Sequence, residues 1–528
     1  MAATQQPSTR MKATLWLERY APGLIIVAGL VVRLISAHSK FLNADEAMHY
    51  LLAMQPSVSD AYRASLGTAH PPLLILLLHY WEMISRSEFF LRLPSVVAGT
   101  AAGWFLYAWL RDVRDRGTAV VALALFLFSP ALIYTSTEIR QYALLLCFMS
   151  AALYLLDRAI ATNSPMLLLS SGTLSCLALV THYCALIFGL AAAIYGFIRI
   201  VSVRTRLSLR LIWLAVQLGF ATIAAFLWKT HIAIIRHRPL TQDVAESYLR
   251  SSLFHPDEEN IFVFLGRANL RLFHFFFSQG AISIAGLLLF AIGIVLLFRE
   301  KSHTSSRDPS SRQLGVLLLL PFAINSVTAL AGIYPYGGTR HDVYLAIFAV
   351  PTIAVALGYW QPSRRWTKPV AVLIALAVCN FTVIPAGAYI KPKNQRKELM
   401  KQAVAYLSTS AAPGSIVLTD YESGLLLSYY VCQKDITHSG QPIGFFYHAQ
   451  CGNYQSVSLL PRLWVFRAET FPSQISELAK SSLEDHQVWL FQAGFIVDRE
   501  PEFQALLAKY GCAEPRRFGA NILVCKIQ

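Results

Sequence analysis

Charged residues are scarce in this sequence. Only 14% of its 528 residues are Asp, Glu, Lys or Arg, whereas a soluble domain carries roughly a quarter. Hydrophobic residues make up 55% of the chain and come in long blocks. These features exclude a water-soluble globular protein, a disordered chain and a small disulfide-stapled domain. They predict a polytopic membrane protein with some soluble mass attached.

Acidic residues are fewer than basic ones, which gives a net charge of +15. The excess does not come from residues 386–528, which hold 14 Lys and Arg against 12 Asp and Glu. It lies in the apolar part of the chain, where Lys and Arg in short loops orient helices in a bilayer. The basic balance therefore requires no anionic partner, and we expect no nucleic acid to bind.

Several motifs are also missing. No Gly-rich phosphate loop follows the first strand expected near the C-terminus, so nucleotide binding is not indicated. The cysteines do not have the spacing of a zinc site. No internal repeat is visible, although transporters usually contain one.

The hydrophobic blocks predict eleven membrane spans, because a spanning helix needs about 20 mostly apolar residues. They are expected near residues 20–37, 91–110, 118–134, 141–156, 166–181, 183–198, 211–229, 281–298, 314–331, 342–359 and 369–386. The first is read as an anchor and not as a cleaved signal, since a poor cleavage site follows it. Residues 260–279 predict an amphipathic helix on the membrane surface.

The distribution of Lys and Arg predicts the orientation of these spans. With the N-terminus in the cytoplasm, the inner segments hold 18 Lys and Arg and the longer outer segments hold 8. This asymmetry follows the positive-inside rule. It places the residues after the eleventh span outside the cytoplasm, and we expect a bacterial inner membrane with this part in the periplasm.

The C-terminal part alternates strand and helix patterns, which predicts a small α/β domain. Strands are expected at residues 415–420, 462–466, 487–491 and 521–525, and helices at 473–482 and 501–510. The fold class is thus an all-α membrane bundle of about eleven spans (residues 1–388) with an outer α/β domain (residues 389–528).

Four of the eight cysteines fall in this outer domain. An even number in an oxidising compartment allows two disulfides in three alternative pairings. We expect Cys432–Cys451 and Cys512–Cys525, because the members of each pair are near in sequence.

The most informative polar residues follow the first span. Asp45 and Glu46 are adjacent carboxylates just beyond a membrane helix, where charge is costly. One of them can accept a proton from a hydroxyl nucleophile. The alternative is a solvated helix N-terminus, where the helix dipole favours Asp and Glu.

Other polar residues recur at the outer ends of the spans. They are His70, Glu138, Arg140, Tyr142, His182, Tyr183 and Arg340. Arg340 follows a glycine pair and can hold a phosphate through two hydrogen bonds. Taken singly, these residues are equally explained as interface anchors or surface side chains.

Together they resemble the GT-C glycosyltransferase superfamily. The nearest likeness is to glycosyltransferase family 39, with its dolichyl-phosphate-mannose–protein mannosyltransferases, and to lipid A aminoarabinose transferases. It covers roughly residues 20–385. The residues that carry it are Asp45-Glu46, His70-Pro71-Pro72, Arg92-Leu93-Pro94-Ser95 with Gly99, Glu138-x-Arg140-x-Tyr142, His182-Tyr183 and Arg340. The chain departs from the family at His341, where a tyrosine often follows the late arginine.

The resemblance implies an enzyme that transfers a sugar, with inversion, from a polyprenyl-phosphate carrier to an acceptor hydroxyl outside the cytoplasm. It implies that Asp45 is the general base and that Glu46 orients Asp45, the acceptor or a cation. Arg140 and Arg340 would stabilise the leaving phosphate. The acceptor would be a glycan, a lipid or a protein.

The sequence itself requires no cofactor, because no spacing of its residues demands a metal, but a divalent cation is possible. Some members of the superfamily use a divalent cation, and Asp45, Glu46, His70 and His182 are the residues that would lie near one. The competing function is a transporter or flippase of a lipid-linked or small substrate, which also needs many spans and buried charges.

Overall fold

The computed structural model describes most of the apolar part of the chain and selected segments of the C-terminal part. The described residues are 9–246, 248–300, 307–359, 396–419, 421–432, 436–438, 448–451, 454–458, 487–493, 511–519 and 522–527.

Eight helices among the described residues are long and apolar enough to cross a membrane. Their spanning segments are Tyr20–Ser39, Glu88–Val113, Tyr142–Thr162, Ala185–Ser202, Leu207–Ile235, Gly280–Arg299, Ser311–Leu330 and Arg340–Tyr359. They correspond to α1 (Thr9–Ser39), α5 (Glu88–Val113), α8 (Tyr142–Thr162), α10 (Ala185–Ser202), α11 (Leu207–Leu227), α15 (Gly280–Arg299), α16 (Ser311–Leu330) and α17 (Ala346–Tyr359). A π-helical turn, Trp228–Ile232, and α12 (Ala233–Ile235) extend α11, and a 3₁₀ helix, Arg340–Leu345, precedes α17.

Two shorter apolar helices complete the bundle, α6 (Arg116–Phe128) and α9 (Pro165–Leu179). Ten of the eleven predicted spans therefore have a helix in the structure, and the predicted fold class is confirmed. The eleventh, 369–386, lies outside the described residues, as does the expected domain boundary at residue 388.

The span expected at 118–134 is wrong in one respect, because the helix is broken within it. Asp115 caps α6, which ends at Phe128, and Pro130 then starts the separate helix α7 (Pro130–Thr135). Proline at the first position of a helix has no N–H to donate, so it begins a new helix more easily than it continues one.

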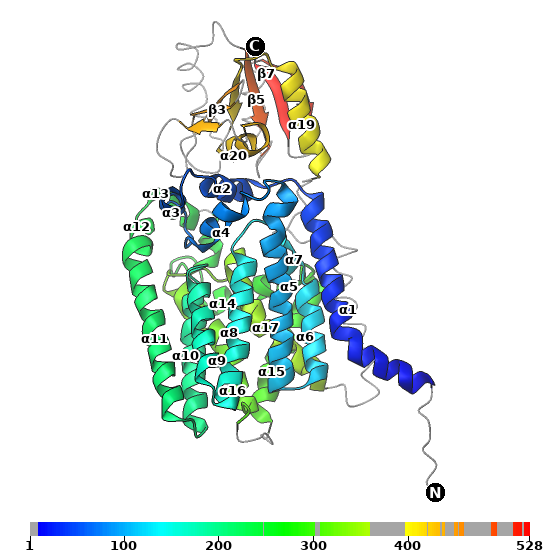
Figure 1. Cartoon of the computed structure of the whole chain (residues 1–528), viewed down its shortest axis with the longest axis vertical. Helices are drawn as coiled ribbons and strands as arrows, with labels where there is room; N and C mark the ends of the chain where they lie inside the picture. Colours follow the sequence, from blue (N-terminus) through cyan, green and yellow to red (C-terminus); the bar gives the residue numbers. More distant parts are fainter. Residues whose placement is uncertain are drawn as a thin grey trace.

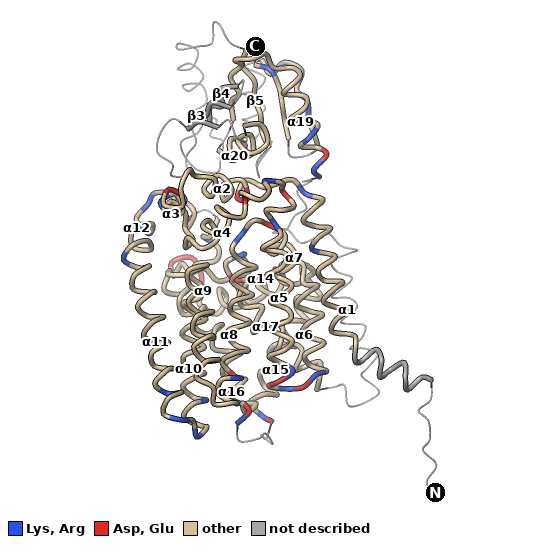
Figure 2. The backbone as a smooth tube through the Cα atoms, in the orientation of Figure 1, with Lys and Arg blue, Asp and Glu red and all other residues tan. Residues whose placement is uncertain are grey.

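Short helices cover one end of the bundle. They are α2 (Ala44–Ala53), α3 (Val58–Ser65), α4 (Leu73–Trp81) and α13 (Pro239–Glu246), with the 3₁₀ turn Arg250–Ser252 near α13. In Figure 1, α2 and α4 lie between the bundle and the C-terminal sheet. We call this end of the bundle the sheet end. Figure 2 shows that the middle of the long helices carries few charged residues.

The amphipathic helix expected at 260–279 is present as α14 (Ile261–Phe277). It buries Phe264, Phe273 and Phe276 against the bundle and exposes Phe262. One face of this helix is thus part of the core, and the exposed residues include Phe262, Leu270 and Arg271.

The C-terminal part contains α19 (Lys397–Ser410), α20 (Tyr421–Leu427), a π-helical turn at Ser428–Cys432 and one sheet. The described strands follow the order β2-β3-β4-β1-β5-β7-β6. Their bounds are β1 (Ile416–Thr419), β2 (Ile436–His438), β3 (His448–Cys451), β4 (Tyr454–Ser458), β5 (Val488–Gln492), β6 (Cys512–Arg517) and β7 (Leu523–Ile527). β1 pairs in parallel with β4 and β5, and the other pairs are antiparallel.

Three of the four predicted strands are found, as β1, β5 and β7. The expected strand at 462–466 and the expected helices at 473–482 and 501–510 lie outside the described residues. The sequence pattern did not predict β2, β3, β4 and β6, which are more polar than the other strands. Fully buried strands such as β1 give a continuous apolar run, whereas these strands do not.

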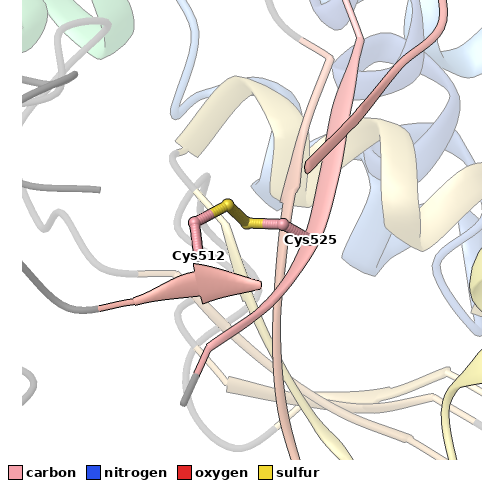
Figure 3. The surroundings of a disulfide bond; sticks show 2 residues. All are labelled: Cys512 and Cys525. Carbon is pink, nitrogen blue, oxygen red and sulfur yellow. A yellow bond between two sulfur atoms is a disulfide. The ribbon is translucent and has the colours of Figure 1, made fainter. Parts of the chain in front are cut away.

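The predicted disulfide between Cys512 and Cys525 is present and joins the adjacent strands β6 and β7 (Figure 3). Cys432 is also disulfide-bonded. Cys147, Cys176 and Cys184, which lie in or beside apolar helices, are free thiols as expected for packing residues.

Buried arginines tie the helices together. Arg33, on α1, donates to the Ser136 hydroxyl at 2.8 Å and to the Leu127 carbonyl at 2.8 Å. Near the other end of the bundle, Asp157 accepts hydrogen bonds from Trp109 and Tyr195 and pairs with Arg199. Each of these buried side chains makes hydrogen bonds within the protein, which lowers the cost of placing it in an apolar bundle.

Gly99, a residue of the family motif, is where α5 passes the loop that begins at Ser136. A Cβ added at Gly99 would overlap the side chain of Ser136. We therefore expect Gly99→Ala to destabilise the protein by about 1–3 kcal/mol, as other overpacked cores do. Melting in detergent measures this effect.

Gly219→Ala is the matched control, since Gly219 also lies within a long helix and a Cβ there would meet nothing within 4 Å. Alanine favours helix more than glycine, so this variant should melt at or above the wild-type temperature. Equal melting of the Gly99→Ala variant and the wild type would contradict close packing at Gly99.

Candidate active site

The paired carboxylates lie in the first turn of α2, directly after the segment that joins α1 to α2. The Asn43 side chain accepts a hydrogen bond from the Glu46 amide at 3.0 Å, and the Glu46 carboxylate accepts one from the Asn43 amide at 2.9 Å. This capping box starts α2 and places Asp45 and Glu46 in its first turn. Both are buried, with 3% and 1% of their surface exposed, so neither belongs to a solvated helix N-terminus.

Glu46 holds this segment against the bundle. Arg92, on α5, donates to both oxygens of the Glu46 carboxylate at 2.7 Å, and the Ile139 amide donates at 2.9 Å. Arg92 also donates to the carbonyls of Ala37 and Phe41 at 2.8 and 3.0 Å. Arg92 is therefore buried and holds the segment between α1 and α2 against α5.

Asp45 pairs with two arginines that are distant in sequence. Its Oδ2 lies 3.0 Å from Nη1 of Arg140 and 2.6 Å from Nη1 of Arg340. Arg140 follows α7 in the loop that leads to α8, and Arg340 begins the 3₁₀ helix before α17. The structure thus brings together the carboxylate and the two guanidinium groups that the sequence singled out.

The two arginines decide the charge state of Asp45. Burial by itself would raise the pKa of this carboxyl, but the charges of Arg140 and Arg340 outweigh it and hold the pKa well below its usual range. Asp45 is therefore ionised at neutral pH. The three side chains together carry one net positive charge, which suits a bound anion.

The loop before Arg340 is shaped by Asp342. One oxygen of its carboxylate accepts hydrogen bonds from the amides of Gly337, Gly338 and Thr339 at 3.1, 3.1 and 3.2 Å. Gly338 has φ +81°, and a Cβ there would overlap the backbone of Arg271. The glycine is therefore required for the close approach that aims Arg340 at Asp45.

Four histidines lie next to this ion-paired group. The ring of His70 has its centroid 6.3 Å from His49, 5.2 Å from His182 and 6.4 Å from His341. We call these four residues the histidine group. Burial and the charge of Arg140 lower the pKa of both His49 and His182 to about 3. These two rings are neutral at pH 7 and can exchange hydrogen bonds with hydroxyl groups without adding positive charge.

Several buried polar atoms around Asp45 have no hydrogen-bond partner within the part of the chain that the structure describes. They are Nε of Arg140, Nε of Arg340, Nδ1 of His70, Nε2 of His182 and both amide atoms of Gln141. A buried donor or acceptor without a partner costs about 1–3 kcal/mol. So many in one place are typical of a site whose polar ligand supplies the missing partners.

The remaining predicted residues fall around the same centre. Glu138 accepts a hydrogen bond from the Asn43 side chain at 2.6 Å. Burial and the negative charge of Glu46 raise the pKa of Glu138 above its usual range. The Tyr142 ring lies 5.6 Å from the Arg140 guanidinium and 5.5 Å from the His182 ring.

Tyr183 has different neighbours. Its hydroxyl contacts the His231 ring in the π-helical turn that follows α11, and His231 in turn contacts the Thr68 carbonyl at 2.9 Å. In this structure Tyr183 therefore links α10 and α11 to the loop that precedes His70.

Sequence reasoning passed over four residues of this site. They are Asn43, His49, Gln141 and His341. Each lies within four positions of a predicted site residue. Closeness to a predicted motif is therefore the sequence signal that could have identified these four residues. The periodicity of α2 offers a second signal, because His49 follows Asp45 by one helical turn and its Nδ1 lies 2.6 Å from the Asp45 carbonyl oxygen.

The described residues around Asp45 do not form a ready-made site for a divalent cation. Among the described residues, no three His, Cys, Asp or Glu side chains are arranged to hold a metal ion. Both carboxylate oxygens of Glu46 and Oδ2 of Asp45 already contact arginines, which compete with a cation for these oxygens.

Comparison with known proteins gives one family match. Residues 69–228 match the family model of dolichyl-phosphate-mannose-protein mannosyltransferases. This region contains His70, Arg92, Glu138, Arg140 and His182. No curated protein sequence matches the chain.

Solved structures resemble the chain over nearly its whole length. ArnT from Cupriavidus metallidurans bound to undecaprenyl phosphate matches with a TM-score of 0.58 and 13% identity, over 97% of this chain and 98% of ArnT. The apo state of ArnT matches with a TM-score of 0.53 and 12% identity, over 98% of both chains. The Archaeoglobus fulgidus oligosaccharyltransferase tethered with an acceptor peptide gives 0.50 and 11%, over 90% of this chain and 69% of that one.

At identities this low, the matches show a shared fold and not a shared reaction. The reaction has to follow from the residues of the site. The apolar helices and the shared fold make the chain an integral, multi-pass membrane protein. The predicted resemblance to dolichyl-phosphate-mannose-protein mannosyltransferases is confirmed over residues 69–228, and the chain shares the fold of ArnT.

Proposed function

We propose that this protein transfers a sugar from a polyprenyl-phosphate carrier to an acceptor hydroxyl at the sheet end of the bundle. The observation that carries the proposal is the buried Asp45 carboxylate between Arg140 and Arg340. This arrangement combines a proton acceptor with two anion-binding groups. Glycosyl transfer from a phosphate carrier requires both.

In the proposed reaction, the acceptor oxygen forms a bond to the anomeric carbon while the bond from that carbon to the phosphate oxygen breaks. The leaving phosphate keeps the electron pair, and Arg140 and Arg340 stabilise its negative charge. The proton of the acceptor hydroxyl passes to Asp45. Attack from the face opposite the phosphate inverts the configuration of the anomeric carbon.

Binding of the donor would also adjust the strength of the base. Both arginines contact the same oxygen of Asp45 and lower its pKa, which makes the carboxylate a weak base before the donor arrives. A phosphate that shares the guanidinium groups weakens their hold on Asp45 and adds a negative charge nearby. The pKa of Asp45 then rises, so proton transfer is favoured only when the donor is in place.

The histidine group and Gln141 supply the hydrogen bonds that we assign to sugar and acceptor hydroxyls. Neutral imidazoles and an amide both donate and accept, as hydroxyl groups do. Within the described residues, unpartnered polar atoms occur not only on Arg140 and Arg340 but also on neighbouring side chains. These are Nδ1 of His70, Nε2 of His182 and both amide atoms of Gln141. We therefore propose that phosphate binds at the arginines and that carbohydrate lies toward the histidine group.

The proposed carrier and location have separate support. ArnT, which shares the fold, was solved with undecaprenyl phosphate, a polyprenyl phosphate. The inner segments of the predicted orientation hold 18 Lys and Arg against 8 in the outer segments, which favours a cytoplasmic N-terminus and a sheet end outside the cytoplasm. A bacterial inner membrane is the location that we propose.

The test is transfer of radiolabelled sugar from synthetic polyprenyl-phosphate sugars to a membrane extract by purified wild-type protein. Labelled product that depends on donor and protein supports the proposal. A protein that instead moves labelled lipid-linked sugar across liposomes without transferring it would be a flippase, and this result would replace the proposed function.

A further inference from the structure

A tyrosine of the C-terminal part reaches the segment that carries Asp45. Tyr430 lies in the π-helical turn after α20. Its hydroxyl accepts a hydrogen bond from the backbone N–H of Leu42 at 2.8 Å and donates one to the Glu88 carboxylate. Glu88 also pairs with Lys397, at the start of α19. One hydroxyl thus joins the C-terminal part, the start of α5 and the segment between α1 and α2.

The buried backbone N–H of Leu42 needs a hydrogen-bond acceptor from outside its own segment. Leu42 is fully buried and lies between two helices, so neither helix ladder supplies an acceptor for its N–H. Arg92 holds the carbonyls on the preceding side, at Ala37, Lys40 and Phe41. The segment is therefore fixed by Arg92 from the bundle and by Tyr430 from the C-terminal part.

The neighbouring Tyr429 makes a contact of a different kind. Its hydroxyl donates to the Arg86 carbonyl at 2.7 Å, and its ring meets the edge of Tyr50 at 5.0 Å. These contacts also dock the C-terminal part on the bundle. They involve the approach to α5 and the end of α2, away from the segment that leads into Asp45.

We infer that Tyr430 is a positioning residue through which the C-terminal domain sets the place of Asp45. Leu42 precedes the α2 cap Asn43 by one residue and Asp45 by three, so a shift of its amide moves the first turn of α2. The inference rests on the proposed transfer reaction, in which Asp45 must reach the acceptor proton.

The first test is Tyr430→Phe, which keeps the ring and removes the hydroxyl. Misplacement of a reacting group by 1 Å can cost about 100-fold in rate. We expect loss of one hydrogen bond to move Asp45 by less than about 1 Å, so kcat per folded protein should fall about tenfold. The KM for the donor should change less than about twofold, since Arg140 and Arg340 keep their own anchors.

Tyr429→Phe is the matched control, because it removes one hydrogen bond of the same interface without touching the Leu42 segment. It should keep the wild-type kcat. Equal kcat values for the two variants would overturn the inference and leave Tyr430 as a docking residue only.

Two further measurements separate positioning from general damage. In a double variant with Asp45→Asn, Tyr430→Phe should cause no additional loss, because the group that it positions is gone. A further tenfold loss would show that Tyr430 acts independently of Asp45. Hydrogen exchange of residues 40–46 should accelerate in Tyr430→Phe and not in Tyr429→Phe, and unchanged exchange would also contradict the inference.

The exchange measurement does not require turnover. If the wild-type protein transfers no sugar, the proposed function fails, whereas the exchange result still decides whether Tyr430 holds the segment. The two failures are therefore distinguishable.

Discussion

Asp45→Asn is expected to lower kcat for sugar transfer by about 10³-fold, in the range that a positioned general base contributes. Asparagine has nearly the same shape as aspartate but cannot take the proton of the acceptor hydroxyl. The loss should appear in kcat under saturating donor, since the amide removes the proton acceptor and leaves both arginines free for the phosphate. Initial rates with radiolabelled donor measure it.

This variant also changes stability, which must be separated from chemistry. Asp45 neutralises two buried guanidinium groups, and removal of one partner from a buried ion pair typically costs about 3–5 kcal/mol. Rates should therefore be expressed per amount of folded, monodisperse protein. Donor-phosphate analogue should raise the melting temperature of the variant more than that of the wild type, because the anion replaces the missing charge.

Asp157→Asn is the matched control. Asp157 is also a buried carboxylate that pairs with an arginine, but it links α5, α8 and α10 through Trp109, Arg199 and Tyr195. We expect this variant to lose stability and to keep wild-type transfer per folded protein. Wild-type transfer by Asp45→Asn would place the base elsewhere, and equal losses in both variants would make the effect structural.

The apolar bundle was predictable because its physical rule is simple. A bilayer requires about 20 apolar residues per span, and helices such as α8 and α15 satisfy it without ambiguity. The break between α6 and α7 was harder to predict, because Pro130 stands in an apolar run that satisfies the length rule. The polar strands β3 and β4 gave no apolar run at all.

The three charged residues of the ion-paired group could be selected from the sequence, but their pairing could not. Asp45, Arg140 and Arg340 stand out because charge is rare in such a sequence. Nothing in the spacing of 95 and 295 positions tells which arginine meets which carboxylate. Arg92 is an example of this difficulty. Its motif, Arg92-Leu93-Pro94, does not indicate a partner, because the contact with Glu46 is formed only in the folded bundle.

The contribution of Tyr430 could not be inferred from sequence. Its hydroxyl acts on the backbone N–H of Leu42, and a backbone group is the same at every residue except proline. The partner of such a contact therefore leaves no trace in the local sequence. It is found only when the fold brings a distant domain against the segment.

Arg340→Gln is expected to lower kcat about 10²- to 10³-fold, the cost of removing one group that stabilises charge in a transition state. Arg340→Lys should recover part of this loss, because lysine keeps the charge but cannot form the paired hydrogen bonds of a guanidinium. Arg250→Gln serves as the control, because Arg250 is an exposed arginine in the same part of the protein. The carbonyl of the next residue, Ser251, accepts a hydrogen bond from Arg271. The transfer rate of Arg250→Gln should stay near that of the wild type.

The pH profile of Arg340→Gln gives a sharper test, because Arg340 also acts on Asp45. Arg340 helps to hold the pKa of Asp45 down against burial, so its removal raises that pKa. A base with a raised pKa is protonated at a higher pH, and the rate should therefore decline at less acidic pH in Arg340→Gln than in the wild type. Arg340→Lys keeps a positive charge and should show an intermediate acid limb. An acid limb that stays in place while kcat falls would separate the two effects and leave Arg340 as a phosphate ligand with no influence on the base.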